Sequence, residues 1–204
     1  MSVLESDVIL AKQIPLSPDE IDQAILLART ITRSLVDRAN LHKRDYLERY
    51  IDCLMGQVAE TVVLKWLKSE HKRVARPERT SDKGPDQGYD LVLETKDGSL
   101  FASVKSSIAV KRTDIPSILK NFKIATTRHE VRHINIQVCF RLSIESTPRV
   151  NVPSAELAAI MAWAFDKDLE NAEFFSYKGE TRTAPEVPLS DGRPMRELLD
   201  ILVQ

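Results

Sequence analysis

The sequence predicts an α/β fold in which a mixed β-sheet is flanked by helices. Two observations indicate it. Apolar residues recur at helical spacing in two long segments, residues 17–39 and 45–70. Shorter segments that read as strands follow, with further helical segments among them. Because no internal repeat, low-complexity tract or clear linker interrupts the 204 residues, we expect one domain, 1–204, with a core of its own.

The composition is typical of a soluble globular protein, with 43% hydrophobic and 29% charged residues. No apolar run approaches the ~20 residues that a membrane helix needs, and residues 1–15 lack the pattern of a secretory signal. Cys53 and Cys139 lie in apolar runs and are too few for a disulfide framework. We therefore expect buried free thiols, no membrane partner and a reducing, cytoplasmic location.

The net charge of −1 conceals an uneven distribution of charged residues. Between Phe101 and His133 the chain has seven basic and two acidic residues, whereas from Ser154 onward it has five basic and ten acidic residues. A basic segment of this kind forms either a phosphate-binding face or ordinary solvated surface. Charge alone leaves both interpretations open.

Two helices are predicted in the first third of the chain. Ser17 suits the N-cap, Pro18 the first helical position and Glu20 the third position of a capping box. The first helix should run from there to about Ala39. The second should extend from about residue 45 to residue 70.

The segment GYDLVLETKDGSLFASVKSS predicts a β-hairpin. Asp97-Gly98 is a strong type I′ turn signal between two strand-like runs. With that turn, Asp90 lies directly opposite Lys105, with Cβ atoms about 5 Å apart. Ser103 points to the same face, because side chains alternate with period two along a strand. The predicted register therefore gathers Asp90, Lys105 and Ser103 into one patch.

The remaining segments continue the α/β pattern. Residues 71–87 predict a short strand and a loop, and residues 114–130 a basic helix. Over residues 131–144 apolar and polar side chains alternate, which is typical of a long strand with one buried face. The chain then continues with a strand over 160–165, a short helix from Asp166, a loop over 180–192 and a closing helix over 193–204.

An aspartate beside a lysine on a hairpin suits phosphodiester hydrolysis with a divalent cation. Mg²⁺ takes hard oxygen ligands, typically one or two carboxylates together with water and phosphate oxygens. Asp90 can supply a carboxylate and the main-chain carbonyl of Val104 a second oxygen. Lys105 can orient the attacking water or neutralise developing charge. Glu60, among apolar neighbours, is the candidate for another carboxylate, since such a glutamate is costly unless it is paired or functional.

The sequence has, in this order, a glutamate on a helix, an aspartate on a strand and Ser-Val-Lys on the partner strand. This order resembles the PD-(D/E)xK nuclease superfamily. Restriction endonucleases and Holliday-junction resolvases belong to it. The resemblance covers about residues 45–142 and implies a restriction-endonuclease-like αβββαβ core, Mg²⁺ (or Mn²⁺ in its place) and hydrolysis of DNA phosphodiesters. Carried over position by position, the metal-binding residues are Asp90 and Glu60, and the catalytic lysine is Lys105.

Ser103 stands where the superfamily usually has Asp or Glu. Some of its restriction enzymes carry the same Ser-Val-Lys and recruit a carboxylate from elsewhere in the fold. Glu60 is the first candidate for that carboxylate and Glu130 the second. Asp86, in a Pro-Asp pair, is an alternative to Asp90, although it precedes the strand in the predicted register.

The nuclease interpretation divides the single domain into an N-terminal helical extension over 1–42, a nuclease-like core over 43–145 and a C-terminal strand-and-helix completion over 146–204. Cleavage of both strands of DNA needs two sites, so a homodimer is expected, with the N-terminal helices as a candidate interface. The expected phosphate contacts, which closely follow the catalytic strand, are Lys111, Arg112, Lys120 and Lys123.

Two other functions compete with the nuclease. If no further carboxylate joins Asp90, the chain keeps the fold and binds nucleic acid or a protein partner without cleaving it. Alternatively, Asp90 and Lys105 form a plain surface ion pair in a protein with no nucleic-acid role. His129 and His133 are four residues apart, which would suit a metal site only on a helix, and a strand is expected to begin there.

Overall fold

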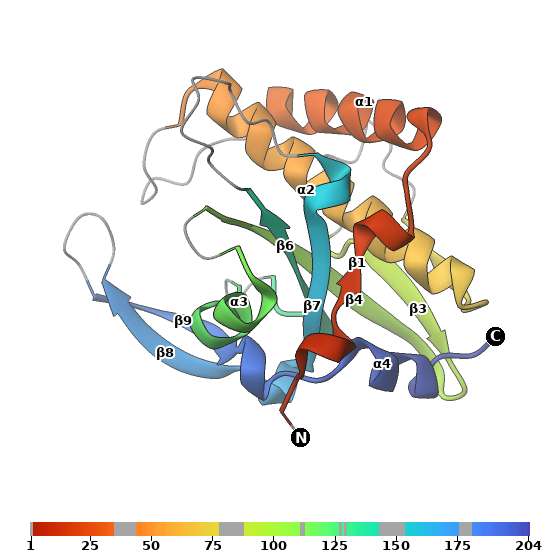
Figure 1. Cartoon of the computed structure of the whole chain (residues 1–204), viewed down its shortest axis with the longest axis vertical. Helices are drawn as coiled ribbons and strands as arrows, with labels where there is room; N and C mark the ends of the chain where they lie inside the picture. The colour runs from red at the N-terminus through yellow and green to blue at the C-terminus, as the bar shows by residue number, and fades with distance from the viewer. Residues whose placement is uncertain are drawn as a thin grey trace.

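A mixed six-stranded sheet is the centre of the fold (Figure 1), in the strand order β1-β7-β6-β4-β3-β2. The computed structural model describes residues 2–34, 44–77, 88–110, 113–126, 128, 130–142, 154–175 and 181–204, of which 171–175 and 181–183 are described by their backbone alone. The six strands are β1 (Ile9–Leu10), β2 (Val74–Ala75), β3 (Leu91–Thr95), β4 (Gly98–Ala109), β6 (Ile134–Arg141) and β7 (Ala158–Phe165).

A second sheet of three strands has the order β5-β9-β8. Its strands are β5 (Lys123–Ala125), β8 (Glu170–Phe175) and β9 (Thr181–Pro188). The α-helices are α1 (Pro18–Ser34), α2 (Tyr46–Ser69), α3 (Ile115–Asn121) and α4 (Met195–Ile201). Short 3₁₀ helices occupy Glu5–Asp7, Ala11–Gln13, Ala155–Leu157, Asp166–Asp168 and Leu189–Asp191. These elements bear out the expectation of an α/β fold with a mixed sheet.

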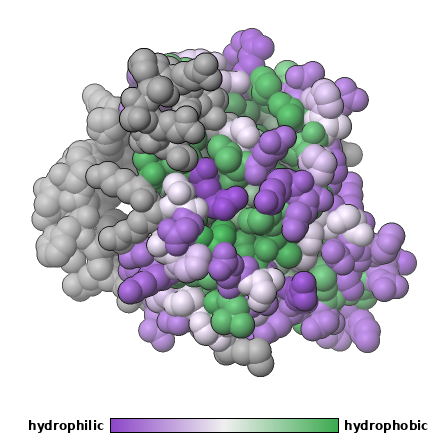
Figure 2. Space-filling view, in the orientation of Figure 1, coloured by the Kyte–Doolittle hydropathy of each residue, from purple (hydrophilic) through white to green (hydrophobic). Residues whose placement is uncertain are grey.

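Each face of the six-stranded sheet has its own buried apolar cluster. On one face, Val62 of α2 belongs to the same cluster as Val104 and Ile136. On the other face, Ile118 of α3 and Ile124 of β5 belong to a second cluster. Figure 1 shows α1 lying along α2, away from α3 and the second sheet. On the face drawn in Figure 2, polar side chains cover most of the surface and apolar ones show between them.

The first two helices begin where the sequence predicts. The Ser17 amide donates to the Glu20 carboxylate at 2.7 Å, and the Glu20 amide donates to Ser17 Oγ at 3.2 Å. At the start of α2, Asp45 and Glu48 exchange the same pair of hydrogen bonds, at 2.9 and 2.8 Å. Both starts are therefore fixed by contacts three residues apart in the sequence. The predicted end of the first helix, at Ala39, lies outside the described residues.

The hairpin turn lies one residue earlier than predicted. Thr95 pairs with Gly98, so Lys96 and Asp97 form the turn rather than Asp97-Gly98. The Thr95 hydroxyl accounts for the difference, because it accepts a hydrogen bond from the Asp97 amide at 3.2 Å and donates one to the Gly98 carbonyl at 2.7 Å.

The earlier turn changes which residues of the hairpin face each other. Leu91 pairs with Ala102, which places Asp90 opposite Ser103 and corrects the predicted pairing of Asp90 with Lys105. A shift of the pairing by two residues changes the partner but keeps the face, because side chains alternate with period two.

The predicted basic helix over residues 114–130 is only half present. Asp114 caps α3 by accepting a hydrogen bond from the Ser117 amide at 2.8 Å, and the helix ends at Asn121. Residues 123–125 then form β5, which pairs with β9. The short helix expected from Asp166 is a single 3₁₀ turn followed by β8, and the expected loop over 180–192 contains β9. In each case strand pairing overrides the local pattern, with a distant segment for β5 and with the neighbouring strand for β8.

Strand β6 is buried on both faces, although polar and apolar side chains alternate along it. Asn135 and Gln137 are fully or almost fully buried. The Asn135 amide group donates to the Arg132 carbonyl at 2.6 Å, and that of Gln137 donates to Ser107 Oγ at 3.1 Å. Buried polar groups are tolerated when they are hydrogen-bonded in this way.

Cys139 is a fully buried free thiol, as expected, and burial raises its pKa to about 12. Cys53 is also a free thiol but only partly buried. None of the helices that the structure describes is long and apolar enough to cross a membrane.

Arg193 attaches the segment before α4 to strand β7. Its backbone amide donates to the Trp163 carbonyl at 2.8 Å, and its guanidinium lies over the Phe165 ring at 5.0 Å from the ring centre. The guanidinium also donates to the Asp168 carboxylate, Nε to Oδ2, at 2.9 Å. This hydrogen bond, more than the one from the Phe165 amide, holds the pKa of Asp168 below its usual value although burial raises it.

We predict that Asp168→Asn lowers the free energy of unfolding by about 1 kcal/mol at neutral pH. Because the pKa of Asp168 is lower in the folded state, its carboxylate stabilises the fold above the unfolded-state pKa of ~3.9. That contribution is lost as the pH falls through the folded-state pKa, so the difference between wild type and variant in urea unfolding should shrink as the pH is lowered into the acid range. Exposed Asp200, changed to Asn, is the control. An Asp168→Asn deficit that stays constant with pH would contradict the prediction.

Candidate functional site

Asp90 immediately precedes the first residue of β3 in the six-stranded sheet. Its carboxylate oxygen Oδ2 accepts a hydrogen bond from the Val104 amide at 2.8 Å and one from Ser103 Oγ at 3.4 Å. The Asp90 amide donates to the Ala102 carbonyl at 2.8 Å. Three consecutive residues of β4 thus hold Asp90, and two of them belong to the predicted site.

The carbonyl of Val104 faces the same side of β4 as the Asp90 carboxylate. In a strand, the N–H and C=O of one residue point to the same neighbouring strand. Since the Val104 amide reaches Asp90, the Val104 carbonyl is directed to the same space beyond the start of β3. A carboxylate and a main-chain carbonyl side by side are the oxygen donors that a hard cation such as Mg²⁺ takes.

Lys105 is paired with Glu130 rather than with Asp90. Its Nζ lies 3.3 Å from Glu130 Oε2, and both side chains are about one-quarter exposed. Lys105 is two residues beyond Ser103 on β4, so it points to the same face at a distance of about 7 Å along the strand. The structure therefore places the lysine next to the aspartate site and brings in Glu130, the second of the two candidate carboxylates.

Glu60 is buried on α2, with only 4% of its surface exposed. The Gln57 amide group donates to Glu60 Oε1 at 2.7 Å, and Arg76 Nε lies 3.6 Å from Oε2. Arg76 also donates to Thr61 Oγ1 at 2.9 Å. The guanidinium offsets the desolvation of the Glu60 carboxylate, which otherwise would be strongly unfavourable at this depth.

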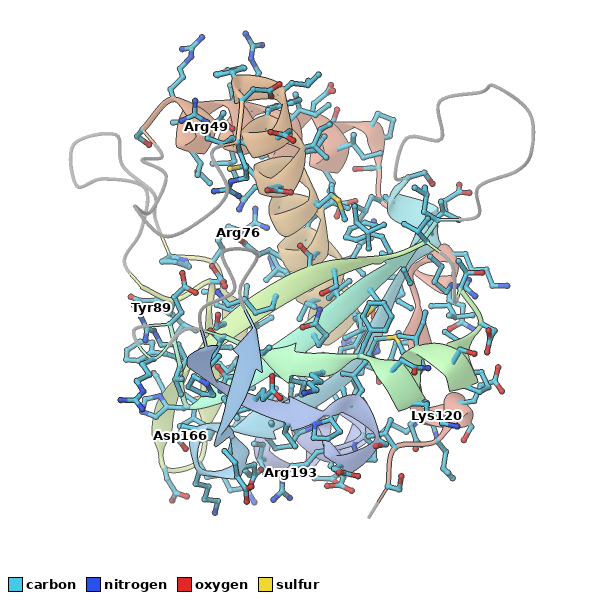
Figure 3. All side chains as sticks on the ribbon, turned by 90° about the vertical axis from the view of Figure 1, so that its left-hand side faces the viewer. Arg49, Arg76, Tyr89, Lys120, Asp166 and Arg193 are labelled. Carbon is cyan, nitrogen blue, oxygen red and sulfur yellow. The ribbon has the colours of Figure 1, made fainter. Side chains whose placement is uncertain are left out.

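Arg76 connects Glu60 to the end of the sheet that carries Asp90. Ala75 of β2 pairs with Val92 of β3, so the next residue, Arg76, falls beside Leu91. Figure 3 shows Arg76 between α2 and Tyr89, the residue before Asp90. Glu60 is therefore held by Arg76, which lies toward this end of the sheet.

The backbone before Asp90 is held by contacts that the sequence did not reveal. Gly88 has a φ of +80°, a conformation that favours glycine, and its carbonyl accepts a hydrogen bond from Arg132 Nε. A Cβ atom at Gly88 would collide with the Arg132 guanidinium. The Tyr89 ring stacks on Phe101 with 4.3 Å between ring centres. Arg132 comes more than 40 positions later, so only the glycine signalled a special backbone here.

Of the predicted phosphate contacts, the structure describes Lys120 and Lys123. Lys120 is exposed at the end of α3, and Figure 3 shows it on the opposite side of the molecule from Tyr89. Lys123 is ion-paired with Glu186 of β9. Lys111 and Arg112 lie outside the described residues, as do Asp86 and His129.

His133 has a structural contact at this end of the sheet. Its Nδ1 accepts a hydrogen bond from the Phe101 amide at 3.1 Å. In the described part of the chain no three His, Cys, Asp or Glu residues are close enough together to hold a metal ion. A cation at Asp90 would therefore depend on one or two carboxylates, the Val104 carbonyl, water and substrate, which is the usual pattern for Mg²⁺.

No protein-family model, curated protein or solved structure matches this chain.

We predict that Arg76→Ala lowers the free energy of unfolding by about 3 kcal/mol, because it leaves the Glu60 carboxylate buried without its guanidinium. Glu60→Gln combined with Arg76→Ala should lower it by less than Arg76→Ala alone does. The measurement is a double-mutant cycle by urea unfolding in the presence of EDTA.

The control for this cycle is the ion pair between Lys65 of α2 and Glu20 of α1, which lie 2.6 Å apart and are each about one-third exposed. Removing either of them should change the stability by about 1 kcal/mol or less. An Arg76→Ala effect as small as that of Lys65→Ala would show that Glu60 does not depend on Arg76.

Proposed function

We propose that the chain is a metal-dependent nuclease that hydrolyses DNA phosphodiester bonds at Asp90 and Lys105. One observation carries the proposal: the Asp90 carboxylate is hydrogen-bonded to the Val104 amide, on the strand whose next residue is Lys105. This hydrogen bond brings the Asp90 carboxylate next to the part of β4 that carries the Val104 carbonyl and Lys105. The order of the elements α2, β2, β3, β4, α3 and β6 also supports a restriction-endonuclease-like αβββαβ core, with β5 added before β6.

In this proposal Asp90 and the Val104 carbonyl hold Mg²⁺, or Mn²⁺ in its place. The cation supplies Lewis-acid stabilisation of the phosphate oxygens when it is bound. The oxygen-only donor set fits these hard cations and does not fit Zn²⁺, which favours nitrogen and sulfur ligands. Ser103 orients the Asp90 carboxylate from the position where the superfamily usually has an acid.

Lys105 and Glu130 act together beside the cation. The ammonium group of Lys105 neutralises charge that develops on the phosphate and orients the attacking water. Glu130 holds that ammonium group at 3.3 Å in the absence of substrate. We favour Glu130 over Glu60 as the recruited carboxylate, because Glu60 is paired with Arg76 whereas Glu130 is in contact with the lysine itself.

A homodimer is part of the same proposal, since two sites are needed to cut both strands. The first turns of α2 support the N-terminal helices as its interface, because Tyr46, Leu47 and Ile51 are exposed apolar side chains there. Contiguous exposed apolar surface of this kind is typical of protein contacts.

A second candidate function, binding of nucleic acid without cleavage, is favoured by one specific contact. Ser103 donates a hydrogen bond to Asp90 instead of adding a negative charge beside it. With fewer carboxylates the cation would bind more weakly, and the strand edge would serve for binding alone.

The test is a cleavage assay with supercoiled plasmid, single-stranded DNA and branched DNA, in Mg²⁺ or Mn²⁺ and in EDTA. We expect metal-dependent cleavage, which Asp90→Asn, Lys105→Met and Glu130→Gln should each reduce about 100-fold or more. The matched controls are Lys96→Ala and Asp97→Asn, which are exposed in the turn of the same hairpin and should keep full activity.

Cleavage that persists in EDTA, or that Asp90→Asn leaves intact, would refute the nuclease site proposed here. Loss of activity in Glu60→Gln but not in Glu130→Gln would assign the recruited carboxylate to Glu60. Salt-sensitive DNA binding without any cleavage would establish the second candidate.

A further inference from the structure

Three aromatic rings lie in a row beside the Asp90 site. The Tyr89 and Phe101 rings are 4.3 Å apart between centres and 29° from parallel. The His133 ring follows at 5.7 Å from Phe101, at 25°. The rings come from the segment before β3, from β4 and from the segment before β6, and so meet at one end of the sheet.

These rings are not part of the hydrophobic core. None of the three belongs to either of the two apolar clusters that fill the two faces of the sheet. Tyr89 and Phe101 are half-buried and His133 is exposed. A stack of rings that is only partly covered by the rest of the fold leaves apolar surface accessible, which is a feature of binding sites.

The orientation of the row is fixed by contacts with the backbone. His133 Nδ1 accepts the Phe101 amide hydrogen bond, so the histidine ring is held in one position and its Nε2 carries the proton in the neutral form. The Arg132 contact with Gly88 positions the backbone that carries Tyr89. A rigid stack of this kind loses little conformational entropy when a flat ligand adds to it.

The row is next to the residues to which we assign phosphate chemistry. Tyr89 immediately precedes Asp90. Phe101 and Ser103 are two residues apart on β4, so their side chains lie on the same face, about 7 Å apart along the strand. That separation is comparable to one nucleotide of an extended strand, so a phosphate at Asp90 would have an adjacent base within reach of the rings.

We propose that Tyr89, Phe101 and His133 form a stacking platform for an unpaired nucleobase, and that the substrate is accordingly single-stranded or has an unpaired nucleotide at the site. This inference rests on the proposed function. Bases inside a duplex have both faces covered by neighbours and offer only their edges to a protein. Stacking on aromatic rings is the usual way in which proteins hold single strands, and it contributes without regard to base identity.

The test compares the binding of three fluorescent ligands in Ca²⁺, which should permit binding without cleavage. They are a single-stranded DNA of about 12 residues, the same sequence as a duplex, and a single strand in which abasic residues replace every base. We expect the single strand to bind at least about 10-fold more tightly than the other two, because only it offers open base faces to the rings. A 2-aminopurine base in the single strand should lose fluorescence on binding.

Two variants test the platform itself. Tyr89→Leu removes one ring, and His133→Asn removes another while keeping an acceptor for the Phe101 amide. Each should weaken single-strand binding about 10-fold and leave the abasic strand unaffected, whereas a merely structural effect would change both. Leu4→Ala, at an exposed apolar side chain near the start of the chain, is the control and should change neither.

Equal affinity for the single strand and the duplex, or equal effects of Tyr89→Leu on the normal and the abasic strand, would overturn the inference. In that case, cleavage that requires Asp90 would still support the proposed nuclease. Failure of the stacking platform can therefore be distinguished from failure of the proposed function. Conversely, base-dependent single-strand binding without cleavage keeps the platform and removes the nuclease. A parallel titration with RNA of the same sequence shows which polynucleotide provides the base.

Discussion

The parallel pairing of β4 with β6 is the constraint on which the rest of the structure depends. It aligns residues 102–109 with residues 134–141 at the centre of the sheet. Parallel neighbours cannot be joined by a tight turn, so the chain must cross from the end of one strand to the start of the next. In this molecule α3 and β5 lie within that crossover and cover the second face of the sheet. β4 also continues past Leu91, the first residue of β3, and the candidate site lies at that position.

The strand edge that β3 leaves uncovered explains the position of Asp90. β3 begins at Leu91, opposite Ala102, so Val104 of β4 has no β3 residue to accept its amide hydrogen bond. The Asp90 side chain takes that place with a charge-assisted hydrogen bond. The same interaction thus satisfies the Val104 amide and fixes the Asp90 carboxylate against β4.

Local sequence patterns predicted the elements that are specified by residues close together in the sequence. A capping box marked the start of α1, and the period of two gathered Asp90 and Ser103 on one face even though the register was wrong. The patterns could not predict that the Thr95 hydroxyl would compete for the turn, or that β5 would pair with β9 more than 60 residues later. The burial of Asn135 and Gln137 also escaped prediction, because it depends on the second layer and not on β6.

For the candidate site, sequence reasoning identified the residue types but not their partners. Asp90, Ser103 and Val104 come together as expected, since they belong to one hairpin. The partners of Glu60 and Lys105 are Arg76 and Glu130, which lie 16 and 25 positions away and were accessible only through the fold. Buried charges select partners by spatial proximity, which single-sequence patterns do not encode.

The pairing of β1 with β7 affects how the protein is made. Ile9 is partnered by Ile160, about 150 residues later in the chain. At a synthesis rate of roughly 5–20 residues per second, that strand waits on the order of ten seconds on the ribosome before its partner exists. Until then the chain can form the hairpin and the helices that are already synthesised, but β1 has no strand to pair with. It therefore stays open to chaperones or to other nascent chains.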